Sequence, residues 1–253
     1  MPLPFDGGTA GLDWQPPKTS HKPNRRTPPR DQGAPCCVPR CPGKISRRKT
    51  WGYLCDRHGI ANRRWGHPQQ TALKVRDLDP YLQVVKRVRE RSKGTDWSAV
   101  YARWRAVVAV AREYLDQVRK GHAHVGYRRQ AADIVTQLAD NMEEARAVDL
   151  VMAVYLLEEF EPRRFHSDEA FRTCLLHILR KEAKVGRRFN LKVGGREKAS
   201  YRILGQKVRE EAAKWAIEGL GLVGLHVARQ ERARVNAQDS LNTAYRDAVA
   251  SIG

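Results

Sequence analysis

The sequence lacks any apolar run long enough to cross a membrane, and its N-terminal stretch lacks the shorter apolar run of a signal peptide. Its most apolar stretch, AVDLVMAVYLL at 147–157, contains Asp149 and is shorter than the roughly 20 residues that a transmembrane helix needs. The N-terminal stretch MPLPFDGGTAGLDWQPPKTSHKP has no apolar core typical of a secretory signal. We therefore expect a cytoplasmic protein without a membrane partner. In that compartment thiols stay reduced, so clustered cysteines favour metal binding over disulfides.

Acidic residues are scarce relative to basic ones. The 253 residues include 28 Asp and Glu against 47 Lys and Arg, which gives a net charge of +19. Residues 1–66 hold 13 basic and four acidic side chains, and the rest of the chain is also basic. Such an excess predicts a polyanionic partner, with nucleic acid favoured over an anionic membrane surface.

Recognisable catalytic motifs are also missing. No Walker loop, Gly-x-Ser-x-Gly or His-Glu-x-x-His sequence occurs, and GLGLVG at 219–224 has no preceding strand to make it a nucleotide fingerprint. His122 and His124 form a close pair, but they follow Gly121 in a predicted connection without clustered carboxylates nearby, so we expect an exposed loop. His177 falls on an apolar helix face and is expected to be a core histidine. The sequence therefore favours a binding protein over an enzyme.

Composition divides the chain into three parts. Residues 1–33 are rich in Pro, Gly, Thr and Arg and predict a disordered basic arm. Residues 34–66 contain the clustered cysteines, and residues 70–253 predict a mainly helical domain. Apolar residues at helical spacing predict helices at about 72–93, 96–120, 128–144, 147–160 and 168–184, and again at 199–218 and 223–249, where Gly219, Gly221 and Gly224 separate the last two.

One stretch of the helical part breaks this rhythm. Between 187 and 203, Phe189, Leu191 and Val193 alternate with polar residues, and Gly194–Gly195 suits a tight turn. A short β-hairpin and a basic loop are both consistent with this pattern. The expected fold class is therefore mainly α, with a small cysteine-rich module and room for one hairpin.

Four of the five cysteines and one histidine fall within CCVPRCPGKISRRKTWGYLCDRH, at 36–58. Cys41 pairs with Cys36 or Cys37 across a turn that contains Pro and Gly, and Cys55 pairs with His58 at a spacing that puts both on one helix face. Loop length favours Cys36, with Cys37 as its substitute. Three cysteines and one histidine fill a tetrahedral sphere, so these residues predict a structural Zn²⁺ site without an open catalytic position. Zinc binding would supply the folding free energy of so small a module.

The predicted order of this module is a knuckle, a hairpin and a helix, which is the order of a treble clef. The spacing C-x4-C-x13-C-x2-H, with Gly52-Tyr53-Leu54-Cys55 before His58 and Arg63-Arg64-Trp65 after it, resembles small zinc-binding modules of phage and plasmid proteins. Such modules often occur beside HNH-type endonucleases. The resemblance covers about 30 residues. It implies a nucleic-acid setting without fixing an activity.

Three basic surfaces are candidates for contact with phosphate, and the least favoured is the arginine-bearing outside of the predicted helix at 96–120. We call the first the module surface; it consists of Lys44, Arg47, Arg48, Lys49, Arg57, Arg63 and Arg64. We call the second the hairpin surface; it consists of Arg180, Lys181, Lys184, Arg187, Arg188, Lys192, Arg196 and Lys198. Of the aromatic residues Trp51, Tyr53 and Trp65, we expect two to form the small core of the module.

These observations predict a zinc-containing nucleic-acid-binding protein that works with other protein subunits in a phage or plasmid assembly. A replication initiator or nuclease with a winged-helix-like domain is the first alternative, because a basic hairpin after a helix can serve as a wing. A protein–protein adaptor that docks through the zinc module is the second. The choice between DNA and RNA stays open.

Overall fold

A computed structural model of the chain describes residues 33–45, 53–92, 94, 96–193 and 196–250. The predicted arm at 1–33 lies outside the described residues except for Gly33. The chain divides into two compact units, residues 1–60 and 61–253. This division falls within helix α1 (Asp56–Trp65).

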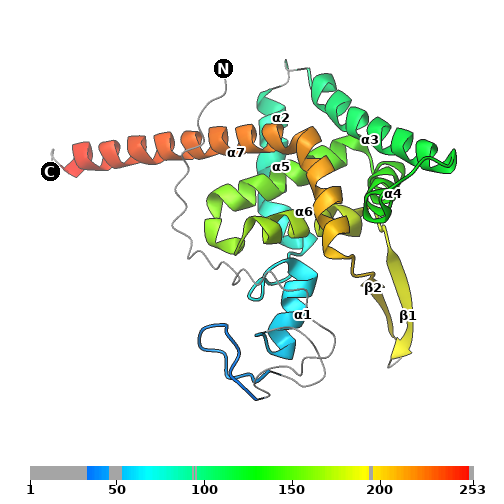
Figure 1. The fold of residues 1–253 in the computed structure, drawn as a ribbon. Helices are drawn as coiled ribbons and strands as arrows, with labels where there is room; N and C mark the ends of the chain where they lie inside the picture. Colours follow the sequence, from blue (N-terminus) through cyan, green and yellow to red (C-terminus); the bar gives the residue numbers. More distant parts are fainter. Residues whose placement is uncertain (1–32, 46–52, 93, 95, 194–195, 251–253) are drawn as a thin grey trace, which may run out of the picture. The chain divides into compact units, whose positions relative to one another are not determined.

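The second unit is built from helices, which confirms the predicted fold class (Figure 1). The helix predicted at 72–93 is a short 3-10 turn, η1 (Val75–Leu78), followed by α2, with Pro80 in its first turn, where proline is tolerated. The longer helices of this unit are α2 (Asp79–Arg91), α3 (Ser98–Arg119), α4 (Gly126–Asn141), α5 (Glu144–Phe160), α6 (Asp168–Glu182) and α7 (Gln206–Ala250). No helix in the described part of the chain is both long and apolar enough to cross a membrane.

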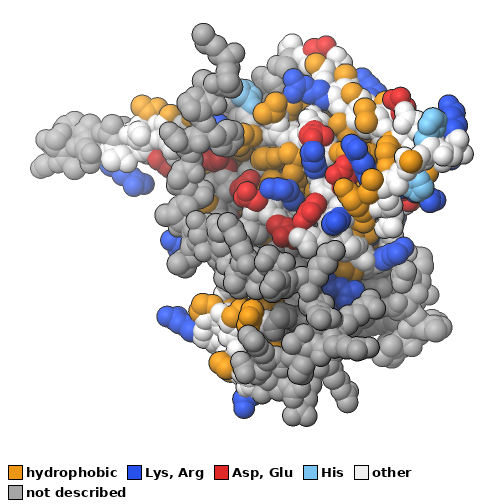
Figure 2. Space-filling model, viewed as in Figure 1, with side chains coloured by type: hydrophobic (Ala, Val, Ile, Leu, Met, Phe, Trp, Pro, Cys, Tyr) orange, Lys and Arg blue, Asp and Glu red, His pale blue; other side chains and the backbone are white. Residues whose placement is uncertain are grey.

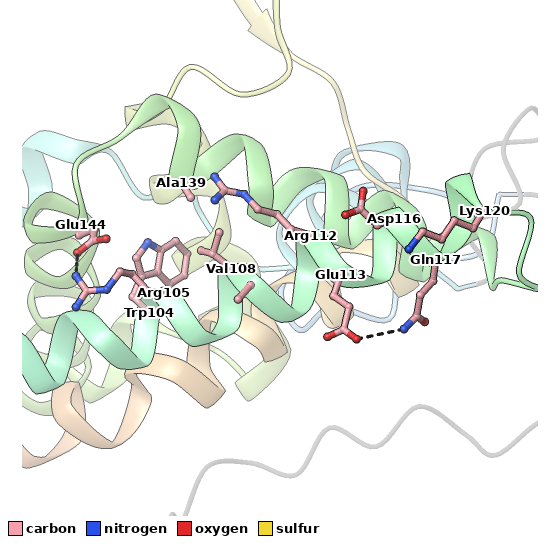
Figure 3. Close-up of a pocket in the computed structure, with 11 residues that line it drawn as sticks. Trp104, Arg105, Val108, Arg112, Glu113, Asp116, Gln117, Lys120, Ala139 and Glu144 are labelled. Carbon is pink, nitrogen blue, oxygen red and sulfur yellow. Dashed lines mark hydrogen bonds and ion pairs between the residues drawn. The ribbon is translucent and has the colours of Figure 1, made fainter.

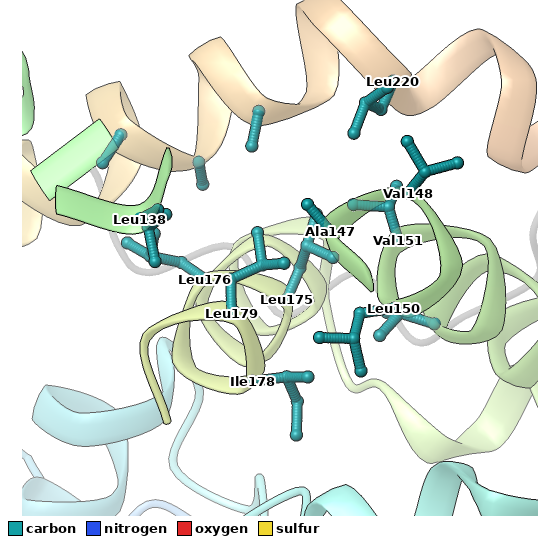
Figure 4. Close-up of a cluster of buried hydrophobic side chains, with 14 of the residues drawn as sticks. Leu138, Ala147, Val148, Leu150, Val151, Leu175, Leu176, Ile178, Leu179 and Leu220 are labelled. Atoms are coloured by element: carbon teal, nitrogen blue, oxygen red, sulfur yellow. The ribbon is translucent and has the colours of Figure 1, made fainter. Parts of the chain in front are cut away.

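Helix α5 is the centre of the second unit. Its sequence is apolar on nearly every face, and nine of its residues are buried, including Leu150, Leu156 and Leu157. Figure 4 shows side chains of α5 in one buried cluster with Leu220 of α7, leucines of α6 and Leu138 of α4, which lies beside Leu176. A helix that is apolar all round is stable only when neighbours cover every side, and α2, α3, α6 and α7 do so here.

Several helix ends form where the sequence predicts them. The Ser167 hydroxyl accepts a hydrogen bond from the Ala170 N–H at 3.1 Å and caps α6. Asp96 accepts hydrogen bonds from the Ser98 N–H and O–H at 2.8 and 2.6 Å, next to the start of α3. Gly121 follows α3 with a φ of +86°, the left-handed conformation that glycine adopts freely. Pro162 lies two residues beyond the end of α5 at Phe160.

The stretch after α6 is a hairpin, one of the two structures that its pattern allows. Strand β1 (Arg187–Val193) pairs antiparallel with β2 (Arg196–Tyr201), and Arg187 lies opposite Tyr201. The predicted turn at Gly194–Gly195 lies outside the described residues.

The predicted break between the last two helices is wrong. Residues 206–250 form one helix, α7, which bends but does not end (Figure 1). A β-carbon added at Gly219 would lie 2.8 Å from Val107 Cγ2, and one at Gly224 would lie 2.5 Å from the Tyr155 ring. The glycines therefore let α3 and α5 approach the α7 backbone closely, at a modest cost in helix propensity.

We predict that Gly224→Ala destabilises the protein by about 1–3 kcal/mol, because the methyl group would overlap the half-buried ring of Tyr155. Gly126→Ala, at the start of α4, is the matched control because no atom lies within 4 Å of the added carbon. Thermal and urea unfolding measure both variants. An unchanged or raised stability of Gly224→Ala would contradict close packing at this glycine.

Candidate metal centre

The first half of the site is a tight loop that ends in a short backbone bridge. The Cys36 N–H donates to the Gly43 carbonyl at 3.0 Å, and the Ile45 N–H donates to the Ala34 carbonyl at 3.0 Å. Arg40 turns the loop with a φ of +62°. These bonds bring Cys36 and Cys41 to the same end of the loop.

The second half comes from the start of α1. Cys55 directly precedes the helix, its carbonyl accepts the Gly59 N–H at 2.8 Å, and His58 lies in the first helical turn. A hydrogen bond from the Cys37 N–H to the Tyr53 carbonyl, 3.0 Å long, joins this segment to the loop. The spacing of three residues puts both side chains on the same side of the helix start.

The four ligand atoms lie close enough to bind one metal ion. The sulfurs of Cys36, Cys41 and Cys55 and a ring nitrogen of His58 are all within 4.8 Å of one another. His58 Nδ1 lies 3.3 Å from the Cys36 sulfur and 3.4 Å from the Cys55 sulfur, and the Cys41 and Cys55 sulfurs are 3.8 Å apart. Within the described ranges this is the one group of His, Cys, Asp and Glu side chains so arranged.

The backbone around the cluster donates to the sulfurs. The Gly43 N–H lies 3.3 Å from the Cys41 sulfur, and the Cys55 N–H lies 3.4 Å from the Cys36 sulfur. A β-carbon at Gly43 would lie 3.0 Å from the Cys55 sulfur and 3.3 Å from the Cys41 sulfur, so only glycine leaves room there. N–H groups that point at sulfur stabilise thiolates, which are the form that binds metal.

Cys36 and Cys37 differ in burial and in charge preference. Burial raises the pKa of the Cys36 thiol, but hydrogen bonds from the Cys55 and Val38 N–H groups and from His58 outweigh burial and bring this pKa to about 6. The Cys37 side chain is exposed and lies outside the cluster. Partial loss of hydration around its sulfur, together with the neighbouring Cys36, raises the pKa of the Cys37 thiol. The geometry thus groups Cys36, and not Cys37, with the other three ligands.

The expected aromatic core of the module is not found. Cys36, Val38, Leu54 and Cys55 form its buried cluster, while Tyr53 is 61% exposed. Trp65 belongs to the second unit, where its ring contacts that of His177 edge-on at 4.8 Å. Trp51 lies outside the described residues. The prediction is wrong for Tyr53 and Trp65, because the buried packing of the module comes from two of the ligand cysteines and the apolar residues next to them.

The module surface is exposed wherever it is described. Lys44, Arg57, Arg63 and Arg64 lie on the outside, while Arg47, Arg48 and Lys49 are outside the described residues. The hairpin surface is divided: Lys184 and Arg187 are exposed, Lys181 is half-buried and Arg180 is buried. The side chains of Arg188, Lys192, Arg196 and Lys198 are outside the described part of the chain.

A surface hollow of about 620 Å³ runs along α3 (Figure 3). Its charges are neutralised within the protein, since Arg105 pairs with Glu144 at 2.7 Å and Arg112 pairs with Asp140 at 2.7 Å. Over the helical part of the face seen in Figure 2, acidic side chains likewise lie among the basic ones. His122 and His124 are exposed in the connection after α3, as predicted. This hollow therefore offers no concentrated charge and no cluster of catalytic groups.

No protein-family model matches the sequence, and no curated protein or solved structure is significantly similar to it. The interpretation of the site therefore rests on the chain's own residues.

We predict that Cys36→Ser lowers the bound metal from one ion per chain to a small fraction, because it removes one of four ligands. Cys37→Ser is the matched control and should keep the full ion, because the Cys37 thiol is exposed and outside the cluster. Elemental analysis of the purified variants measures both. Loss of metal from Cys37→Ser with retention in Cys36→Ser would contradict this ligand set.

Proposed function

We propose that the cluster holds a structural zinc ion. Two sulfurs bound to one zinc at about 2.3 Å and the tetrahedral angle lie about 3.8 Å apart, and the Cys41 and Cys55 sulfurs are 3.8 Å apart. Three thiolates and an imidazole favour zinc over magnesium or calcium, which prefer oxygen ligands. The set is complete with four protein ligands, so the ion's expected role is to fold the module.

We further propose that the module binds nucleic acid through the phosphate backbone. The observation that carries this proposal is the surplus of positive charge on the module. Residues 34–66 contain eight basic residues and one acidic residue. Arg40, Lys44 and Arg57 are exposed, and none of them forms an ion pair with another described residue.

The helical unit differs from the module in this respect. Many of its arginines have a carboxylate partner, as in Arg89 with Asp149 and Arg146 with Glu182. A paired guanidinium gains less from a phosphate, because the existing ion pair must be broken or shared. The module combines eight basic residues with one acidic residue in a short segment, so its charge per residue is high, and contact with phosphates there would release counterions.

The resemblance to zinc modules of phage and plasmid proteins supports a role as one subunit of a larger nucleic-acid-handling assembly. It rests on Cys36, Cys41, Cys55 and His58 together with the Arg63-Arg64-Trp65 segment. The treble-clef arrangement belongs to this proposal, because the hairpin expected between the ligand pairs lies outside the described residues.

One observation favours a second contact surface. Hairpin β1–β2 directly follows α6, and its sequence contributes Arg187, Arg188, Lys192, Arg196 and Lys198. A basic hairpin after a helix is the arrangement with which a wing touches backbone phosphates. This keeps open the alternative of a winged-helix-like initiator or nuclease, with the hairpin as its principal contact.

We predict that replacing Arg47, Arg48 and Lys49 together with Gln weakens nucleic-acid binding at least tenfold in low salt. The slope of log K against log salt should also become shallower, by about 2.7 on duplex DNA and about 2.1 on single-stranded RNA, because three phosphate contacts are lost. Fluorescence anisotropy with labelled duplex DNA and single-stranded RNA, each at several salt concentrations, measures both quantities.

Two further triple variants carry the same change in charge. The first replaces Arg187, Arg188 and Lys192 by Gln and tests the hairpin. The second is the general control and replaces three arginines that are exposed on α3, α4 and α7, namely Arg103, Arg129 and Arg229. A larger loss from the hairpin triple than from the module triple would shift the proposed contact to the hairpin. Absence of binding to either polymer at low salt would overturn the proposal.

A further inference from the structure

A pocket of about 480 Å³ lies within the second unit, between the C-terminal end of α1, helix α6 and the connection from β2 to α7. Four arginines line it: Arg64, Arg180, Arg202 and Arg209. No Asp or Glu is among the lining residues. The volume falls within the range of about 300–1,000 Å³ that is usual for sites of small organic ligands.

Arg180 is the most unusual of these residues. It is 5% exposed, and its one hydrogen bond in the described structure is from Nη2 to the Arg202 carbonyl, 3.1 Å long. Its buried Nε has no hydrogen-bond partner. Burial lowers the pKa of Arg180 to about 10, so the guanidinium keeps its charge at neutral pH.

Other buried charges of this unit are compensated by opposite charges. Glu231 is 5% exposed and pairs with both Arg91 and Arg234. Arg209 is 7% exposed and lies 3.5 Å from a carboxylate oxygen of Glu169. Arg180 has no such carboxylate among the described residues, although a buried cation without a counter-charge is costly. An anion in the pocket would provide that counter-charge.

The backbone leaves room for the Arg180 head group. Gly186 has a φ of +71°, and a β-carbon there would lie 2.6 Å from Arg180 Nη2. The Val185 N–H donates to the Arg180 carbonyl at 2.9 Å, and this bond fixes the turn after α6. Arg180 is thus held in place by a turn that only glycine can complete without strain.

The pocket also has an aromatic wall. Trp65 meets His177 edge-on at 4.8 Å, and His177 meets Tyr201 at 6.1 Å. Burial, with Arg180 and Lys181 nearby, lowers the pKa of His177 to about 4, so its ring is neutral and adds no further charge. Arginine forks beside aromatic rings can bind a phosphate and a planar aromatic group together.

We propose that this pocket binds a phosphate monoester attached to an aromatic group, of which a nucleotide is the fitting biological class. The phosphate would lie among Arg64, Arg180 and Arg202, and the aromatic group would lie against Trp65 and Tyr201. Such a ligand is either a free nucleotide or the phosphorylated end of a strand. The inference goes beyond the proposed function, because it requires no contact between a polynucleotide and the residues around the metal cluster, although Arg64 belongs to both surfaces.

The test is calorimetric titration of the full-length protein with adenosine monophosphate and with adenosine, which lacks the phosphate. We expect saturable binding of the monophosphate and at least tenfold weaker binding of adenosine. Arg202→Gln should weaken monophosphate binding at least tenfold without loss of folding, because this side chain is exposed and in no ion pair with a described residue. Arg229→Gln, an exposed change of equal charge on α7, is the matched control and should bind as the unmodified protein does.

A second titration identifies the source of the phosphate. Two short oligonucleotides of one sequence, one with a 5′-phosphate and one with a 5′-hydroxyl, are compared on the unmodified protein and on Arg202→Gln. Either monophosphate binding or a 5′-phosphate preference supports the pocket, provided that Arg202→Gln weakens it at least tenfold. Equal binding of adenosine and its monophosphate, an effect of Arg229→Gln as large as that of Arg202→Gln, or neither kind of binding overturns it. The Arg47, Arg48 and Lys49 triple variant should leave monophosphate binding unchanged, which separates this result from the proposed function.

Discussion

Four ligand atoms within 4.8 Å of one another are the constraint on which the cysteine-rich module depends. Its buried cluster contains Cys36, Val38, Leu54 and Cys55, so two of the four core residues are themselves ligands. So little apolar surface cannot offset the conformational entropy of ordering the chain. Three thiolates brought together without a cation would also repel one another. A bound metal would remove that repulsion and fix the loop around Cys36 and Cys41 against the start of α1.

The helical unit has a different source of stability. Helix α5 is enclosed by apolar neighbours, and glycines in α7 bring α5 and α3 close to its backbone. Arginines of this unit such as Arg89, Arg105 and Arg146 pair with carboxylates, whereas Arg40, Lys44 and Arg57 of the module pair with no described carboxylate. Because a structural metal lets a short, highly charged segment hold one conformation, the module can present a charge density that an ordinary small core would not support.

Periodicity and ligand spacing predicted much of this structure from the sequence. Cys55 and His58 lie at the start of a helix, and Ser167 caps α6, because each depends on local chemistry that short spacing encodes. The three glycines of α7 were misleading, since a glycine that ends a helix and one that admits a ring such as that of Tyr155 look alike in sequence. Trp65, one of three aromatic residues of which two are expected in the module core, packs in the helical unit because its partner, His177, is more than a hundred residues away. The arginine pocket was missed because Arg64, Arg180 and Arg202 come from separate elements. The position of Arg180, four residues after Leu176 on a mostly apolar helix, was the one available sign that it is buried.

The central claim is that a metal ion organises the basic module for contact with phosphate. The most direct measurement is the nucleic-acid affinity of one protein sample as purified, after removal of metal by a chelator, and after zinc is restored. The account predicts that chelation weakens binding at least as much as the loss of the Arg47–Lys49 charges does, and that zinc restores it, while the helical signal of residues 61–253 is largely retained. Equal affinity in the metal-free and zinc-loaded states would contradict it.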